Sequence, residues 1–205
     1  MNLAKYAAAA LLCGTLAVAA DVEKGISLYN AGDYNGALGE LQPAVDADAS
    51  NRNARYYLAL SMIGLQRYSD ADTHLKQLEE QEGTPPEPAD LKVAVARSAM
   101  GQKDFDKAQQ YLDQARDANS ESAEVYLRRG ELGVLRQQYD TAAKDLERSI
   151  ELDANRAYAH YYLGIAYSNL RRPDKMVEQF ELFRKLAPNA PEVRKVEATL
   201  QSVRR

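Results

Sequence analysis

HYYLGIAYSNLRRPDKMVEQFELFRKLAP, residues 160–188, is the stretch of this chain that decides its fold. Two runs of residues with apolar positions at helical spacing flank a short polar turn at Arg171 and Arg172. This pattern predicts two amphipathic helices joined by a tight turn. The preceding sequence carries earlier, imperfect copies of the same unit, so the chain is expected to be built from repeats.

The copies become visible as columns of equivalent residues. An aromatic residue follows each of the first four polar turns, at intervals of 34, 37 and 34 residues: Tyr34, Tyr68, Phe105 and Tyr139. A small residue precedes each turn at a fixed distance: Gly25, Ala59, Ala96, Gly130 and Gly164. A further column downstream of each turn holds Ala37, Ala71, Ala108, Ala142 and Met176. Small side chains in these columns let the two helices of a unit approach each other closely.

These columns resemble the tetratricopeptide repeat (TPR), a helix–turn–helix unit of about 34 residues. The resemblance covers residues 18–190, approximately, and includes five units. It implies an all-α fold, an α-solenoid of five repeats at approximately residues 21–51, 52–85, 89–122, 123–156 and 157–190. In such solenoids function resides on the concave face rather than in a catalytic cleft.

Two places depart from the repeat pattern. The stretch GTPPEP, residues 83–88, makes the second repeat three residues too long. Gly83 should end the preceding helix, and the prolines should prevent its restart. Two interpretations are open, a tolerated loop insertion or a hinge between repeats 1–2 and repeats 3–5. In the fifth repeat Pro173 replaces the turn aromatic, at a helix start where proline is tolerated.

The C-terminal segment, residues 191–205, predicts one additional helix. Val193, Val196, Leu200 and Val203 form a single apolar stripe on it. Solenoids need a terminal element to cover the apolar face of the last repeat. We therefore expect this segment to be a capping helix.

The first twenty residues predict a secretory signal peptide. Lys5 precedes an almost wholly apolar run that ends at Ala20, and small residues stand before either cleavage site next to Asp21. The mature protein would then be periplasmic or secreted, and the Ala-rich signal is typical of bacteria. The other interpretation is an N-terminal core helix. Cys13, the only cysteine, would anchor the protein to a membrane if lipidated, but Leu12 before it disfavours that.

Composition and motifs argue against several classes of function. The 205 residues carry a net charge of −4 with both signs interspersed, and no basic stripe indicates a nucleic acid partner. Motifs for phosphate binding, zinc hydrolysis or serine hydrolysis are absent from the sequence. His74 and His160 have no second metal ligand at suitable spacing, and His160 is expected to pack between helices. We expect neither catalysis nor a cofactor nor a metal.

The resemblance implies which side chains line the concave groove. In the family, fixed positions of the first helix of each repeat face inward. Their equivalents here that suit peptide contact are Tyr56, Leu60, Ile63, Arg97, Tyr158, Tyr161 and Ile165, and Arg128 lies beside them. The Lys and Asn clamp that some members use for a terminal carboxylate is missing. An alternative stays open, in which some tyrosines only pack between repeats and Arg97 pairs with Glu131.

The sequence thus predicts an exported scaffold or adaptor that binds a protein or peptide ligand through its groove. Tyrosine suits this task because it offers a large contact area and loses little entropy on binding. The alternative is a structural protein that self-associates into a homo-oligomer, or an assembly factor for an envelope complex. Partner, pathway and organism do not follow from the sequence.

Overall fold

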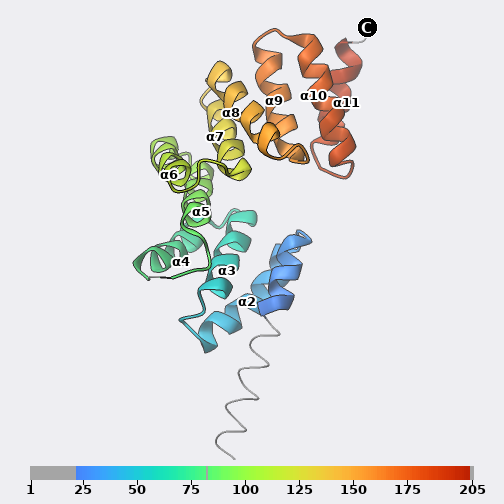
Figure 1. Ribbon diagram of the computed structural model, residues 1–205. Coiled ribbons are helices and arrows are strands. Elements are labelled where there is room, and N and C mark those ends of the chain that lie inside the picture. The colour runs from blue at the N-terminus through green and yellow to red at the C-terminus, as the bar shows by residue number, and fades with distance from the viewer. Residues whose placement is uncertain (1–21, 82, 204–205) are drawn as a thin grey trace, which may run out of the picture. The chain divides into compact units, whose positions relative to one another are not determined.

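A computed structural model describes residues 22–81 and 83–203 of the protein (Figure 1). Throughout these residues the chain forms helices and no strand, which confirms the all-α fold. The expected signal segment, residues 1–20 with Cys13, lies outside the described residues, as do Asp21, Glu82, Arg204 and Arg205. Every helix of the described part is too short or too polar to cross a lipid bilayer.

The helices follow one another in pairs. Residues 22–30 form the first helix. The others are α2 (Tyr34–Ala47), α3 (Arg52–Gly64), α4 (Tyr68–Glu80), α5 (Pro88–Gly101), α6 (Phe105–Ala118), α7 (Ala123–Leu135), α8 (Tyr139–Leu152), α9 (Ala157–Asn169), α10 (Pro173–Leu186) and α11 (Val193–Val203). We call the helix 22–30, α3, α5, α7 and α9 the A helices, and the helix that follows each of them its B helix.

The chain divides into two compact units, residues 1–103 and 104–205, and each is described by itself. In the first unit, α2 packs on α3, α3 packs on α4, and α5 packs on both α3 and α4. In the second unit, each helix from α6 to α11 packs on the next one, and α7 also packs on α9. Successive A helices therefore lie side by side within each unit, as do α3 and α5 in the first and α7 and α9 in the second.

The turn between the A and B helices has one geometry in all five repeats. Its central residue has a positive φ, between 56° and 81°, at Gly32, Gln66, Lys103, Gln137 and Arg171. In four of the turns the next residue donates its N–H to the carbonyl five residues earlier, as Arg67 does to Met62 at 2.8 Å. This is the Schellman ending, which satisfies the free carbonyls of a helix. Four of the five central residues adopt this positive φ without being glycine, at a cost of about 1–2 kcal/mol each.

Small residues of the A helices allow close packing against their B helices, as the sequence predicts. A Cβ atom on Gly130 would lie only 2.3 Å from Leu146, and one on Gly164 only 2.5 Å from Phe180. In the facing column Ala37, Ala71, Ala108 and Ala142 are completely inaccessible to solvent. Interiors packed this densely leave no room for a larger side chain. These columns therefore set the spacing of the two helices in a repeat.

The turn aromatics form contacts between repeats. A Cβ atom on Gly64 would lie 2.6 Å from the ring of Tyr34, and one on Gly101 would lie 2.1 Å from the ring of Tyr68. Each of these rings thus packs against the end of the A helix in the following repeat. The aromatic column exists because stacked repeats must bury an apolar surface between them.

Arg52 contacts both the end of α4 and the insertion that follows it, residues 83–88. Arg52, at the start of α3, donates from Nη1 to the carbonyls of Leu78 (3.1 Å) and Gln81 (2.8 Å) and from Nε to that of Pro85 (3.2 Å). Lys92 of α5 forms an ion pair with Glu79 of α4 at 2.8 Å across the same loop. These contacts favour the loop insertion over the hinge, and the two units separate after Lys103 rather than here.

The C-terminal helix α11 begins at Val193, two residues later than the segment expected from the sequence. Val196 and Leu200 are 1% and 3% exposed and belong to the core that α9 and α10 form. Val193 is partly buried against that core, whereas Val203 is 46% exposed. The apolar stripe therefore covers the last repeat with three of its four residues, because the final turn extends past the core.

Candidate peptide-binding faces

The eight residues predicted to line a groove divide between the two units. Tyr56, Leu60 and Ile63 lie on α3 and Arg97 lies on α5, in the first unit. In the second unit, Arg128 lies on α7 and the remaining three on α9: Tyr158, Tyr161 and Ile165. All eight belong to A helices. We therefore describe two separate faces, each within its own unit.

On the face of the first unit, the prediction is wrong for two residues. Leu60 and Ile63 are only 5% and 7% exposed, so they are core residues rather than contact residues. The reason is that α3 packs on α2, α4 and α5, which together leave little of it accessible. Tyr56 and Arg97 are partly exposed and remain on this face.

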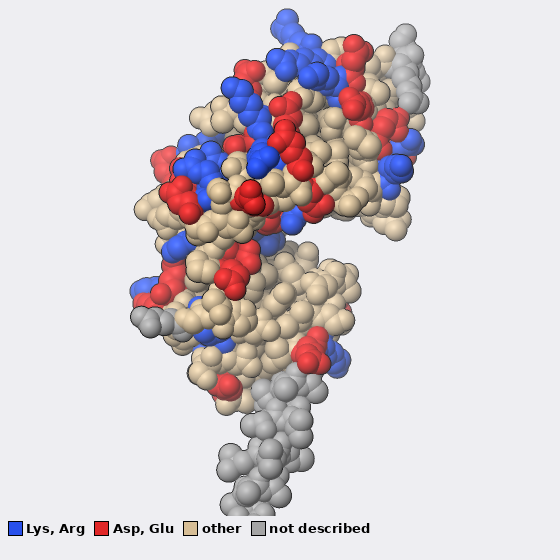
Figure 2. All heavy atoms as spheres, viewed as in Figure 1, with Lys and Arg blue, Asp and Glu red and all other residues tan. Residues whose placement is uncertain are grey.

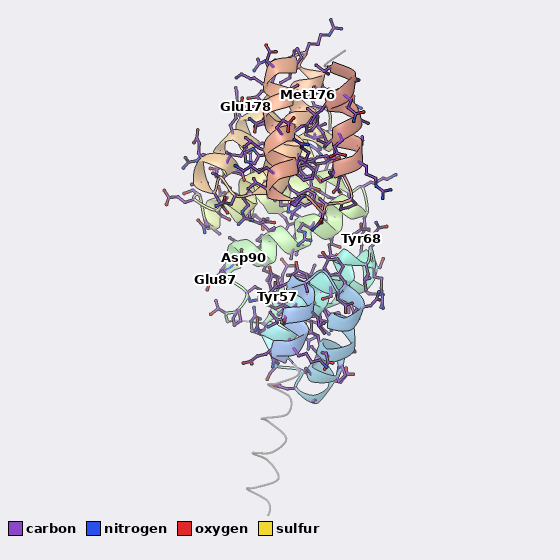
Figure 3. The ribbon with its side chains drawn as sticks, turned by 90° about the vertical axis from the view of Figure 1, so that its right-hand side faces the viewer. Tyr57, Tyr68, Glu87, Asp90, Met176 and Glu178 are labelled. Carbon is purple, nitrogen blue, oxygen red and sulfur yellow. The ribbon has the colours of Figure 1, made fainter. Side chains whose placement is uncertain are left out.

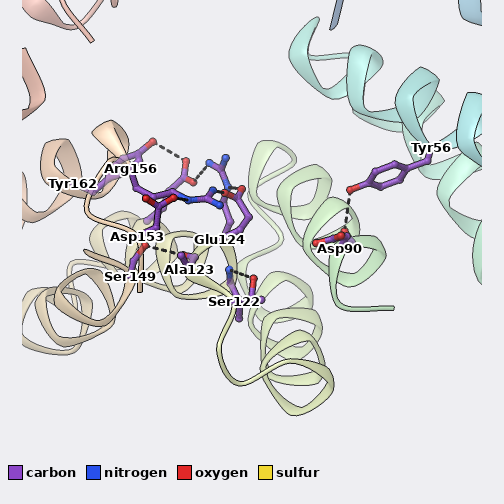
Figure 4. Close-up of polar contacts among 12 residues, drawn as sticks. Tyr56, Asp90, Ser122, Ala123, Glu124, Ser149, Asp153, Arg156 and Tyr162 are labelled. Carbon is purple, nitrogen blue, oxygen red and sulfur yellow. Dashed lines mark hydrogen bonds and ion pairs between the residues drawn. The ribbon is translucent and has the colours of Figure 1, made fainter. Parts of the chain in front are cut away.

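A row of tyrosines runs along the same unit. The ring of Tyr56 meets that of Tyr57 edge-on at 5.5 Å, Tyr57 meets Tyr29 at 5.4 Å, and Tyr29 lies 5.7 Å from Tyr34. The Tyr56 hydroxyl donates to the carbonyl of Asp90 at 3.5 Å (Figure 4). Burial, followed by the charge of Asp90, raises the pKa of the Tyr56 hydroxyl. This row joins the first two repeats, so much of its ring area serves packing.

On the second unit, three tyrosines of α9 form what we call the α9 tyrosine cluster: Tyr158, Tyr161 and Tyr162. Tyr161 lies 5.2 Å from Tyr162 and 6.1 Å from Tyr158, and Tyr158 lies 6.4 Å from Tyr162, between ring centroids. Phe183 of α10 supports the cluster at 5.0 Å from Tyr161 and 5.7 Å from Tyr158. Tyr158 remains 36% exposed, and Tyr161 and Ile165 are partly buried against the core.

Two carboxylates hold the hydroxyl groups of this cluster. The Tyr158 hydroxyl donates to Glu192, just before α11, at 3.1 Å. The Tyr162 hydroxyl donates to Glu131 of α7 at 2.7 Å. Burial, and then the charge of Glu131, raises the pKa of Tyr162, while burial and then Glu192 raise that of Tyr161. Tyr162 is thus held between the A helices α7 and α9, and Tyr158 between α9 and the residue before α11.

Next to the α9 tyrosine cluster, residues of α7 and of the turn before α9 form a network of ion pairs (Figure 4). Arg128 donates to Glu124 at 2.8 Å and to Glu131 at 2.7 Å. Arg156 bonds to Glu124 and pairs with Asp153 at 3.1 Å. Burial acts to lower the pKa of Arg128, but the two glutamates outweigh it and raise the value. The guanidinium group of Arg128 is thus already bound by Glu124 and Glu131. Arg128 therefore has a structural role on this face.

One exposed residue of this unit was missing from the sequence prediction. Leu135, at the end of α7, is 46% exposed. In the other A helices the equivalent residues are Gly64, Gly101 and Asn169, which are small or polar. A large apolar residue at this position could therefore have been noticed in the sequence. Among large apolar side chains of the described residues, only Leu135, Tyr158 and Val203 are exposed. Two of the three thus lie on the adjacent A helices α7 and α9.

Both histidines contact side chains of neighbouring helices. His160 is 4% exposed, and its Nε2 contacts the carbonyl of Ala154 at 3.1 Å while Nδ1 pairs with the Gln179 amide at 2.7 Å. It therefore packs between helices, as predicted. Burial, and then the charge of Arg55, lowers the pKa of His74. Within residues 22–81 and 83–203, no three His, Cys, Asp or Glu side chains gather closely enough to hold a metal ion.

Arg55 repeats the role of His160 in another repeat, which the sequence analysis missed. It is 5% exposed and donates to the carbonyl of Ala49 at 2.7 Å, six residues earlier, as His160 contacts Ala154. It also bonds to Gln77 of the B helix. The shared position shows that this column tethers the A helix to the preceding loop.

Charged side chains of both signs intersperse on the face shown in Figure 2, mainly over the second unit, while the first unit shows mostly uncharged atoms there. No extended basic surface appears among the described residues on that face. The two faces described above thus carry aromatic rings, aliphatic side chains and paired charges. Such a composition is typical of surfaces that bind polypeptides.

Comparison with known proteins agrees with this architecture. Two family models, each described as tetratricopeptide repeat, match residues 28–95 and residues 93–157 and 134–191. No curated protein matches the chain. The solved structures that resemble it include TTC0263, a thermophilic TPR protein of Thermus thermophilus, with 21% identity, a TM-score of 0.77, and coverage of 90% of this chain and 99% of that one.

Two further structures are similar over most of this chain. YrrB, a TPR protein with an unusual peptide-binding site, is 17% identical with a TM-score of 0.55, over 87% of this chain and 90% of its own. A chain of the APC/C hetero-tetramer Cut9–Hcn1 is 14% identical with a TM-score of 0.79, over 92% of this chain and 37% of its own. At these identities the likeness concerns the fold alone.

Proposed function

The chain belongs to the tetratricopeptide repeat family, and from this premise we propose that it is a scaffold that binds a peptide or protein segment on its A helices. Its fold is the expected α-solenoid of TPR units. A stack of short helix pairs offers extended faces of side chains rather than an enclosed cleft. Binding without catalysis is the function that such faces support best.

One observation carries the proposal. Tyr158 and Leu135 keep 36% and 46% of their surfaces exposed on two adjacent A helices of the second unit. Exposed large apolar side chains are candidate contact residues, and these two lie at the end of α7 and near the start of α9. Tyr161 and Ile165 extend the same α9 surface, and Arg128 braces it. Peptide binding by YrrB and the place of the Cut9 fold in a hetero-tetramer support the proposal by analogy of fold.

The first prediction tests this face. We select peptides from a phage-displayed random library on the full mature chain and measure their affinities by fluorescence polarisation. Tyr158→Ala and Leu135→Ala should each weaken binding by about tenfold or more, because truncating a central contact residue removes much of the interaction energy. Their thermal stabilities should fall less than on truncation of a fully buried ring such as Phe183, since neither side chain belongs to the buried core.

The matched control is Val203→Ala. Val203 is 46% exposed, like Leu135, but lies at the end of α11. This variant should bind the selected peptides as the wild type does. If Tyr158→Ala and Leu135→Ala also bind normally, the proposed face is wrong. Sedimentation velocity at two concentrations on the same samples shows whether the chain self-associates instead.

We also propose that the protein is exported, on the basis of residues 1–20 alone. The second prediction is that the intact mass of the soluble protein, expressed in a bacterium, corresponds to a chain beginning at Ala20 or Asp21. Signal peptidases cleave after small residues, and Ala19 and Ala20 provide them. A soluble form that keeps Met1 to Ala19, or a lipid adduct on Cys13, would contradict the export of a free protein.

A further inference from the structure

We propose that the α9 tyrosine cluster binds a cationic side chain, a lysine or arginine of the peptide. The inference rests on the proposed function and specifies the chemistry of its ligand. Three aromatic rings within 6.4 Å of one another, with Tyr158 open to solvent, offer ring faces and edges at one place. Ammonium and guanidinium groups are attracted to the faces of such rings.

The charges around the cluster favour a cation over a neutral apolar group. The hydroxyls of Tyr158 and Tyr162 donate to Glu192 and Glu131, so a carboxylate stands at either end of the cluster. A hydroxyl that donates to a carboxylate makes its ring richer in electrons, which strengthens the attraction for a cation. Each carboxylate also retains lone pairs that can accept hydrogen bonds from an incoming lysine or arginine.

The neighbouring arginines neutralise these carboxylates only in part. Arg128 is shared between Glu124 and Glu131, and Arg156 between Glu124 and Asp153. Together with Glu192, the cluster and the ion-pair network contain four carboxylates and two guanidinium groups. A net charge of two negative units therefore remains to complement a basic ligand.

The tyrosines themselves respond to this negative potential. Besides burial, Glu192 raises the pKa of Tyr161, and Glu131 raises that of Tyr162 in spite of Arg128 nearby. A potential that disfavours the phenolate anion favours a cation at the same place. On the first unit the situation differs, because the Tyr56 hydroxyl donates to a backbone carbonyl rather than to a carboxylate. The cation site is therefore assigned to the second unit.

The third prediction measures the charge of the bound side chain. From the peptides that require Tyr158, one that contains a lysine is resynthesised with norleucine, which keeps the aliphatic length without the charge. We expect affinity to fall about tenfold with norleucine. The variant Glu192→Gln should weaken the lysine peptide by about threefold and leave the norleucine peptide unchanged, because it removes charge but keeps a hydrogen-bond acceptor.

Glu178→Gln is the charge-matched control. Glu178 is exposed on α10 (Figure 3), so this variant changes the net charge equally but leaves the carboxylate partners of Tyr158 and Tyr162 in place. Equal affinity for the lysine and norleucine peptides, or selected peptides that require Tyr158 but carry no basic residue, would overturn the inference and leave the proposed function standing. Peptides that bind without any dependence on Tyr158 or Leu135 would overturn both.

Discussion

Replacing Phe183 with alanine is expected to destabilise the second unit by about 3–5 kcal/mol, the usual cost of removing a buried phenylalanine ring. Phe183 is completely inaccessible to solvent and lies in the core that α9, α10 and α11 share. Its ring also supports Tyr158 and Tyr161. The surrounding helices cannot close the cavity without moving the rings that rest on it.

Chemical denaturation followed by circular dichroism measures this effect. Leu182→Ala is the matched control, because Leu182 neighbours Phe183 on α10 but is only partly buried. Its loss of stability should be smaller, by about 1 kcal/mol or more. An effect of Phe183→Ala no larger than that of Leu182→Ala would show that the ring is not essential to the core. Weaker peptide binding by Phe183→Ala is also expected, since the cluster would lose its support.

Deleting residues 191–205 is expected to destabilise the chain and promote aggregation. The deletion removes Val196 and Leu200, each of which contributes about 1.5–3 kcal/mol if fully buried, an upper bound. It also uncovers the apolar side of the last repeat, and exposed apolar patches drive association. Denaturant midpoints and sedimentation of the truncated chain test both effects.

A shorter truncation provides the control. From the described part of the chain, removal of residues 203–205 takes away only Val203, whose side chain is exposed, so the free energy of unfolding should stay within about 0.5 kcal/mol of the wild-type value. If removal of the whole segment likewise leaves the midpoint unchanged and the chain monomeric, α11 does not function as a cap.

Much of the fold could be predicted because each repeat has small and large residues at the same positions. A glycine at Gly130 or Gly164 is required by the approach of Leu146 or Phe180, so the columns follow directly from helix packing. The Schellman turns were harder to anticipate, since only Gly32 among the five central residues is a glycine. In the other four turns, the way the A helix ends forces a positive φ on the central residue, which is Gln66, Lys103, Gln137 or Arg171.

The candidate site was predicted less well, for a physical reason. Helical spacing shows that Leu60 and Ile63 share a side of α3 with Tyr56, but that side also meets neighbouring helices. Whether a residue there is buried or exposed depends on how closely the neighbouring helices approach. The periodicity of the sequence gives no information about that distance. The carboxylate partners of Tyr158 and Tyr162 lie 34 and 31 residues away along the chain, so they too required the structure.

The short reach of these contacts has a consequence for how the chain folds. Tyr158 to Glu192 spans 34 residues, Tyr162 to Glu131 spans 31, and Arg52 to Pro85 spans 33, so each contact reaches no further than about one repeat length along the chain. Such low contact order avoids the entropy of closing long loops and accompanies rapid folding. Structure can then nucleate in one repeat and propagate to the next, as in a one-dimensional chain of coupled modules.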